Sequence, residues 1–190
     1  MLEEAVASLK DGGGAEMEEK WSPQISIGTS VLIPEGYVAD LDLRLGLYKR
    51  LSSIEDRNDI DAFAGELVDR FGPLPEEVSH LLEIVEIKGL CRKANIAVVE
   101  AGPKGVSLTF RNKTFPNPAG LFAFIQKNAR IAKVLPDQKL IYKAEWEEPT
   151  ERLKNTRALI RKLTEIAEAP AAAVVASPKP AGVQKRQGRG

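Results

Sequence analysis

The clearest hydrophobic pattern in the chain runs from Asn58 to Val78 and predicts two helices joined by a tight corner. Asn58 or Asp59 can cap the first helix, because a short polar side chain accepts hydrogen bonds from the free N–H groups of the first turn. The apolar residues that follow recur at helical spacing, which predicts a single buried stripe made of Ile60, Phe63, Leu67, Val68 and Phe71.

The corner after this stripe carries both a stop signal and a restart signal. Gly72 follows the last apolar residue, at a place where a left-handed turn costs glycine little. Pro75 can open the next helix, and Glu76 and Glu77 would then lie in the first turn, where the helix dipole favours acidic residues. We therefore expect a second helix that extends to about Ala94, with its buried side marked by Val78, Leu81, Leu82, Val85 and Cys91.

The segment Asp40–Leu51 fits two patterns at once. Four leucines alternate with polar residues or glycine at positions 41, 43, 45 and 47, which is typical of a strand. Leu41, Leu45, Tyr48 and Leu51 also fall on one helix face, and Asp40 is then a plausible N-cap. Arg44 lies inside that helical arc, which counts against a helix unless its charged head reaches the edge of the buried surface. Periodicity alone leaves both possibilities open.

The rest of the chain alternates between extended and helical patterns. Residues 22–34 read as extended chain with a bend at Gly28. Later patterns predict strands at 96–100 and 106–110, a helix opened by Asn117 and Pro118, strands at 131–135 and 139–143, and a helix from Glu148 and Pro149 to about Glu168. Helices followed by hairpins with helices between them indicate an α+β domain with a small antiparallel sheet.

Composition narrows the class of protein. The chain has 190 residues, of which 43% are hydrophobic and 28% charged, enough for one domain with a proper core. Lys+Arg and Asp+Glu both number 27, so no net charge draws in DNA and a nucleic-acid role would need a local patch. The single cysteine, Cys91, excludes an internal disulfide, and no apolar run is long enough to span a membrane. We therefore expect a soluble, cytoplasmic protein.

No pattern in the sequence indicates catalysis, a metal site or a cofactor. The phosphate-binding GxxxxGK[ST] loop is missing from the chain. His80, the single histidine, is expected to be a surface or half-buried helix residue rather than a metal ligand. Glu76 and Glu77 are adjacent and would face apart on a helix, and Cys91 lies on an apolar helix face as a small buried thiol.

Two stretches carry a family resemblance. PEGYVADLDLRLGLYKRL (Pro34–Leu51) and ELVDRFGPLPEEV (Glu66–Val78), in this order, resemble the C-terminal domain of the bacterial transcription-repair coupling factor family, Mfd. The resemblance favours a helix over 40–51. It implies a short helix and linker from a preceding motor module at 1–20 and the regulatory domain at 21–168. The composition changes after Glu168: residues 169–190 are rich in Ala, Pro, Gly and basic residues, which predicts a disordered basic tail.

The resemblance also implies a function. In this family the C-terminal domain packs against an N-terminal module that resembles UvrB, and so masks the surface that recruits UvrA. The parent resembles an ATP-driven DNA translocase that displaces stalled RNA polymerase and recruits nucleotide excision repair, and this chain would carry none of that motor. The resemblance assigns the interdomain contact to Glu66, Asp69 and Arg70, with Asp40, Arg44, Lys49 and Arg50 as weaker candidates.

Two other interpretations remain open from the residues alone. Glu66 and Arg70 are four apart on a predicted helix, so they also fit a local ion pair on a solvated face, worth about 0.3–0.5 kcal/mol. The alternative function is a nucleic-acid-binding accessory domain, in which Arg44, Lys49 and Arg50 line a phosphate track together with the basic tail.

Overall fold

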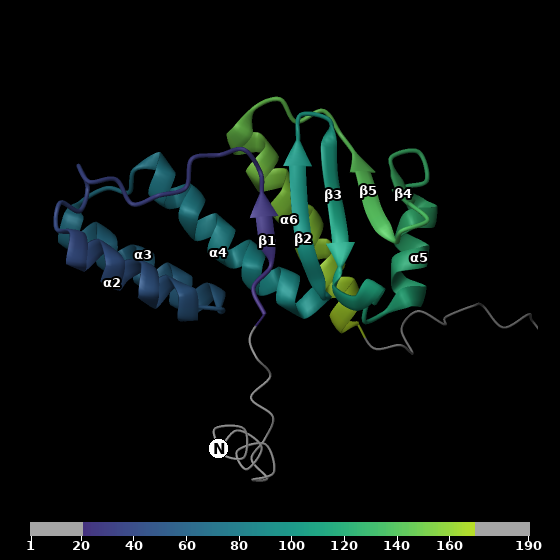
Figure 1. Ribbon diagram of the computed structural model, residues 1–190, viewed down its shortest axis with the longest axis horizontal. Helices are drawn as coiled ribbons and strands as arrows, with labels where there is room; N and C mark the ends of the chain where they lie inside the picture. The colour runs from purple at the N-terminus through teal and green to yellow at the C-terminus, as the bar shows by residue number, and fades with distance from the viewer. Residues whose placement is uncertain (1–20, 170–190) are drawn as a thin grey trace, which may run out of the picture.

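A long central helix, α4 (Glu76–Ala94), belongs to both lobes of the molecule (Figure 1). The computed structural model describes residues 21–169, so the predictions for 1–20 and for the tail from Pro170 lie outside the described residues. One lobe packs α2 (Leu41–Ser53) and α3 (Arg57–Phe71) against the first half of α4. The other lobe is a five-stranded sheet with helices behind one face, as Figure 1 shows.

The helical hairpin is confirmed, with one correction at its start. Gly72 ends α3 with a φ of 90° while its N–H donates to the carbonyl of Val68, so the predicted glycine stop is present. The N-cap is Asp56, whose side chain accepts from the N–H of Asn58. The predicted caps, Asn58 and Asp59, lie inside the first turn instead, because the helix begins earlier than the apolar stripe does.

The ambiguous segment 40–51 is helical, and Asp40 caps it by accepting from the N–H of Leu43 at 2.8 Å. The buried face differs from the predicted one: Leu47 and Leu51 are buried, whereas Leu41 is 59% exposed. Arg44 does not interrupt this face, because its guanidinium turns back to the start of the helix and donates to the carbonyl of Val38 at 2.8 Å.

The sheet is mixed rather than purely antiparallel. Its strand order is β1-β2-β3-β5-β4, and the bounds are β1 Gln24–Ser26, β2 Ile96–Gly102, β3 Gly105–Phe110, β4 Ala132–Val134 and β5 Lys139–Lys143. β1 pairs in parallel with β2, and the other neighbours are antiparallel. A parallel pair needs a crossover connection, which here consists of the whole helical lobe. The remaining elements are the short 3₁₀ turn η1 (Arg111–Lys113) and the helices α5 (Pro118–Lys127) and α6 (Pro149–Glu168).

Each lobe has its own hydrophobic core, and α4 contributes to both. Fully buried residues of the sheet lobe include Ile87, Leu108 and Leu140, whereas Leu67 and Val78 lie in the helical lobe. Burial raises the pKa of the Cys91 thiol to about 12, as expected of a packing residue rather than a nucleophile.

His80 departs from its prediction as a surface or half-buried residue. It is 7% exposed and lies where α4 faces α6, with Nε2 3.4 Å from the Thr150 hydroxyl and 3.7 Å from a carboxylate oxygen of Glu76. The α6 helix covers this face of α4, and no local pattern around His80 signals that distant contact.

A buried carboxylate joins the two lobes. Glu86 on α4 has a side chain only 8% exposed, and it accepts from Arg57 of α3 at 2.7 Å. It also accepts from Arg157 at 3.5 Å and from Arg161, both on α6. The charge of Glu86 is the main reason that the pKa of Arg57 is raised. This set, the Glu86 junction, ties α3 to α6 across α4.

We expect Glu86→Gln to lower the free energy of unfolding by about 2 kcal/mol, because it replaces a charged acceptor that three guanidinium groups share in a buried position. Chemical denaturation of the variant measures this loss. The matched control is Asp61→Asn, which removes the other, exposed partner of Arg57 and should cost less than about 0.5 kcal/mol. Equal losses in the two variants would contradict a special role for the junction.

Candidate functional site

The residues predicted to form the interdomain contact lie on α2 and α3 of the helical lobe. Glu66 is at the centre of an ion network there: Arg50 of α2 donates to both of its carboxylate oxygens, at 2.9 and 2.6 Å. Arg70, one turn further along α3, donates to the same carboxylate at 3.1 Å. The local pair with Arg70 is therefore present, and Glu66 also holds α2 against α3.

Asp69 behaves differently from Glu66. It is exposed, and within residues 21–169 its carboxylate has no hydrogen bond or ion pair. The two acids therefore do not form one unengaged acidic patch. Glu66 is occupied by two arginines of its own lobe although its side chain is 36% exposed, whereas the Asp69 carboxylate is exposed and not engaged by the described residues.

Both arginines of the network also lie over aromatic rings. The guanidinium carbon of Arg50 is 4.9 Å from the centre of the Phe63 ring, and that of Arg70 is 5.0 Å from the centre of the Phe71 ring. Cation–π contact adds to the ion pairs and holds the guanidinium groups against the lobe. This surface therefore presents ordered charges rather than freely rotating ones.

The weaker candidates divide into two groups. Asp40 and Arg44 both satisfy backbone groups at the start of α2, so each has a structural role that explains its presence. Arg50 belongs to the Glu66 network, and Lys49 beside it is exposed. The structure thus brings Arg50 together with Glu66 and Arg70, and leaves Asp40 and Arg44 outside that network.

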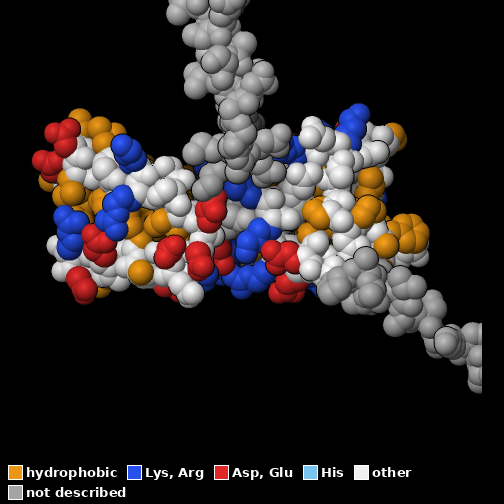
Figure 2. Space-filling model, turned by 90° about the horizontal axis from the view of Figure 1, so that it is seen from below, with side chains coloured by type: hydrophobic (Ala, Val, Ile, Leu, Met, Phe, Trp, Pro, Cys, Tyr) orange, Lys and Arg blue, Asp and Glu red, His pale blue; other side chains and the backbone are white. Residues whose placement is uncertain are grey.

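Sequence reasoning missed the exposed hydrophobic residues on the same two helices. Leu41 and Leu45 of α2 are 59% and 56% exposed, and Val68 of α3 is 43% exposed although it was assigned to the buried stripe. Four alternating leucines cannot all lie on the buried face of one short helix. Their number therefore already indicated that some of them would be exposed. Figure 2 shows hydrophobic side chains mixed with charged ones at this end of the molecule. We call the exposed surface of α2 and α3 the docking face, defined by Leu41, Leu45, Arg50, Glu66, Val68, Asp69 and Arg70.

Within residues 21–169, no group of three or more His, Cys, Asp or Glu side chains could hold a metal ion. No helix in that part of the chain is both long enough and apolar enough to cross a membrane.

The hydrogen bonds from Arg50, and after them those from Arg70, lower the pKa of Glu66 from 4.5 to about 2. Because the pKa is lowered in the folded protein, the ionised Glu66 network stabilises the fold at pH values above the ordinary glutamate pKa. This contribution is lost as the pH falls from about 4.5 toward 2. We expect Arg50→Ala to raise the pKa of Glu66 further toward 4.5 than Arg70→Ala does. Titration of the Glu66 carboxyl carbon by NMR measures both shifts. A larger shift with Arg70→Ala would contradict this geometry.

Comparison with known proteins identifies the fold and the family. The family model described as the TRCF domain matches residues 27–121, which are 95 of the 190 residues. A solved crystal structure of the C-terminal domain of a transcription-repair coupling factor superposes with a TM-score of 0.65. That likeness covers 78% of this chain and 95% of the solved one at 22% identity, so it supports the fold.

Curated relatives agree with the family model. The transcription-repair-coupling factor of Rickettsia conorii (strain ATCC VR-613 / Malish 7) is 40% identical over 142 residues, which are 75% of this chain and 12% of that protein. The one from Escherichia coli (strain K12) is 31% identical over 167 residues, which are 87% of this chain and 14% of that protein. The chain thus spans about an eighth of the length of these relatives. Because the family model covers half of the chain, the protein belongs to the TRCF domain family, as its two sequence stretches predicted.

Proposed function

We propose that this domain is a non-catalytic regulatory module of a transcription-repair coupling factor. In this proposal the docking face binds the UvrB-like N-terminal module of the same parent protein and thereby masks the surface that UvrA binds. The parent would be an ATP-dependent DNA translocase that displaces stalled RNA polymerase and recruits nucleotide excision repair. Residues 1–20 would then come from the preceding motor module, and residues 21–168 would form the regulatory domain.

The observation that carries the proposal is the mixed character of the docking face. A regulatory contact has to open when the parent engages its substrates, so the difference in binding between the closed and open states can be only a few kcal/mol. Ordered surface charges give orientation and specificity, and Leu41, Leu45 and Val68 add limited apolar contact. This composition suits a reversible contact better than a wide apolar interface would.

In this proposal the ion network gives the predicted contact residues different roles. Glu66 would have to give up a two-bond contact with Arg50 before it could bind a partner's base, so we assign it the positioning of Arg50 and Arg70. Those two arginines would face acidic groups of the partner. Asp69, which has no partner within residues 21–169, would meet a basic one.

The alternative, a nucleic-acid accessory domain, receives less support. Its phosphate track needs a local excess of positive charge, whereas Arg44 donates to backbone carbonyls of its own helix start and the Glu66 carboxylate offsets the charge of Arg50. Lys49 remains exposed, and one lysine on a chain of zero net charge supplies little of the counterion release that drives such binding.

Binding in trans tests the proposal. This chain is mixed with the isolated N-terminal module of the parent, and the dissociation constant is measured by calorimetry for wild type and for Asp69→Lys. We expect the reversal to weaken binding about tenfold, because it replaces an attraction by a repulsion at a contact that is only partly desolvated.

The matched control is Glu165→Lys, which makes the same charge change at an exposed position of α6 and should leave the affinity unchanged. Glu66→Lys should also weaken binding, and its unfolding curve separates loss of contact from loss of the helical lobe. Absence of binding by wild type, or equal affinities of wild type and Asp69→Lys, would refute the assigned face.

A further inference from the structure

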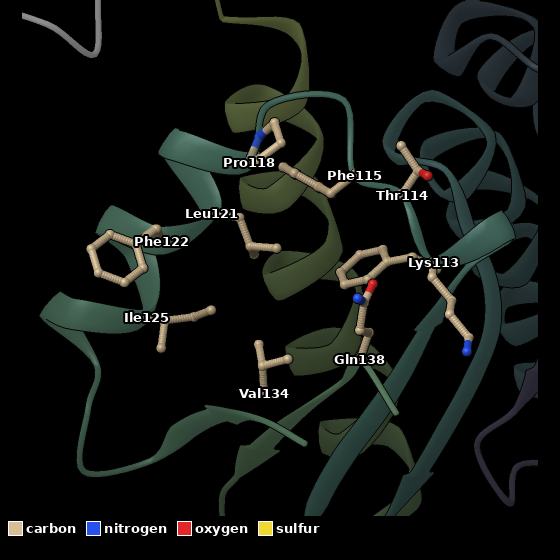
Figure 3. Close-up of a pocket in the computed structure, with 10 residues that line it drawn as sticks. Lys113, Thr114, Phe115, Pro118, Leu121, Phe122, Ile125, Val134 and Gln138 are labelled. Atoms are coloured by element: carbon tan, nitrogen blue, oxygen red, sulfur yellow. The ribbon is translucent and has the colours of Figure 1, made fainter. Parts of the chain in front are cut away.

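A second surface, far from the docking face, carries an apolar groove. It has a volume of about 380 Å³ and lies between α5, the end of β3 with the loop that follows it, and β4 with the turn that leads to β5. Figure 3 shows Phe115, Leu121, Ile125 and Val134 around the cavity, with Pro118 at one end. Among the described residues that line it, only Lys113 is charged. The groove therefore suits a neutral, apolar occupant.

Two of the lining residues are large apolar side chains that are nevertheless exposed to solvent. Phe122 is 64% exposed and Val134 is 43% exposed, although both are large and apolar. Hydrophobic side chains gather at the end of the molecule where α5 lies, opposite the docking face (Figure 2). An exposed apolar surface of this kind is typical of a site where another segment or molecule binds.

The chain leaves α6 next to one end of this groove. The side-chain amide of Asn117, just before Pro118, donates to the carbonyl of Ile166 at 3.0 Å. A Cβ atom on Gly120 would lie 2.6 Å from a methyl carbon of Ile166, so the first turn of α5 is in close contact with the last turn of α6. Ala169 then adopts an extended conformation, with φ −64° and ψ 138°, and directs the chain out of the helix.

We propose that residues 171–176 of this chain, with the sequence AAAVVA, occupy the groove and place Val174 and Val175 against its exposed apolar wall. Pro170 prevents α6 from continuing. Six extended residues span about 20 Å, which exceeds the length of about 15 Å that a ten-residue helix such as α5 has. The segment has no charge, which matches the lining, and the basic residues from Lys179 onward would stay outside.

Covalent attachment favours this occupant over a separate partner. A segment joined to the end of α6 by one or two residues has an effective concentration in the millimolar range at a groove beside it. An untethered peptide of similar composition has no such advantage. A second copy of the chain and a foreign peptide are therefore outcomes that the experiment must be able to reveal.

Disulfide trapping in the full chain tests the proposal. The double variant Val134→Cys with Val175→Cys is oxidised mildly, and cross-linked monomer is quantified by mass spectrometry. We expect it to form at least ten times faster than in the control, Val134→Cys with Gln184→Cys, whose second cysteine lies further along the chain, beyond residues 171–176. Cys91 is fully buried and does not compete.

Each outcome decides the matter. Equal rates in the two variants would overturn the proposal, and so would a covalent dimer whose yield rises with protein concentration, which would indicate a second copy. As an independent readout, Val174→Asp with Val175→Asp should lower the melting temperature by about 2–4 °C, whereas Ala181→Asp should not. An unchanged melting temperature in the first of these variants would also overturn it.

Discussion

The Glu86 carboxylate is the interaction on which the relation between the two lobes depends. α4 runs from one hydrophobic core into the other, with Val78 and Leu82 in the first and Ile87 and Cys91 in the second. Apolar contact alone would let the flanking helices slide along α4. Charge-assisted hydrogen bonds are directional, so guanidinium groups from α3 and α6 that converge on one carboxylate fix how these helices cross α4.

Close packing next to the junction reinforces this constraint. A Cβ atom on Gly89, one turn beyond Glu86, would lie 2.8 Å from the carbonyl oxygen of Glu55. α4 therefore has to present glycine where the loop before α3 crosses it. With the angle between the lobes fixed in this way, α2 and α3 lie at one end of the molecule and α5 lies at the other (Figure 1). In the two proposals above, either surface would therefore bind without rearranging the other.

The sequence predicted features that depend on neighbouring residues. The glycine stop at Gly72, the Asn117–Pro118 start and the Glu148–Pro149 start are confirmed because caps and stops act within one helical turn. The predicted face of α2 was right for Leu51 and Tyr48 but wrong for Leu41 and Leu45, because four alternating leucines fit more than one face and burial is decided by α3 and α4. The parallel pairing of β1 was missed for a similar reason, since its partner lies more than 70 residues away.

At the candidate site, too, contacts between residues close in the sequence could be predicted and contacts between distant residues could not. Glu66 and Arg70 are four residues apart and could be paired from the sequence, whereas Arg50 is 16 residues from Glu66 and Arg161 is 75 residues from Glu86. Whether an acidic side chain is paired within the domain or left unpaired at its surface depends on such distant arginines. Glu66 and Asp69 therefore look equivalent in the sequence but differ in the structure.

Hydrogen–deuterium exchange in the parent protein tests the central proposal, docking through α2 and α3, most directly. The intact parent is compared with a form that lacks its N-terminal module. We expect amides of α2 and α3 to exchange more slowly in the intact protein, while those of β3 and β5 exchange equally in both. Protection confined to the sheet lobe, or none in either lobe, would contradict docking through this face.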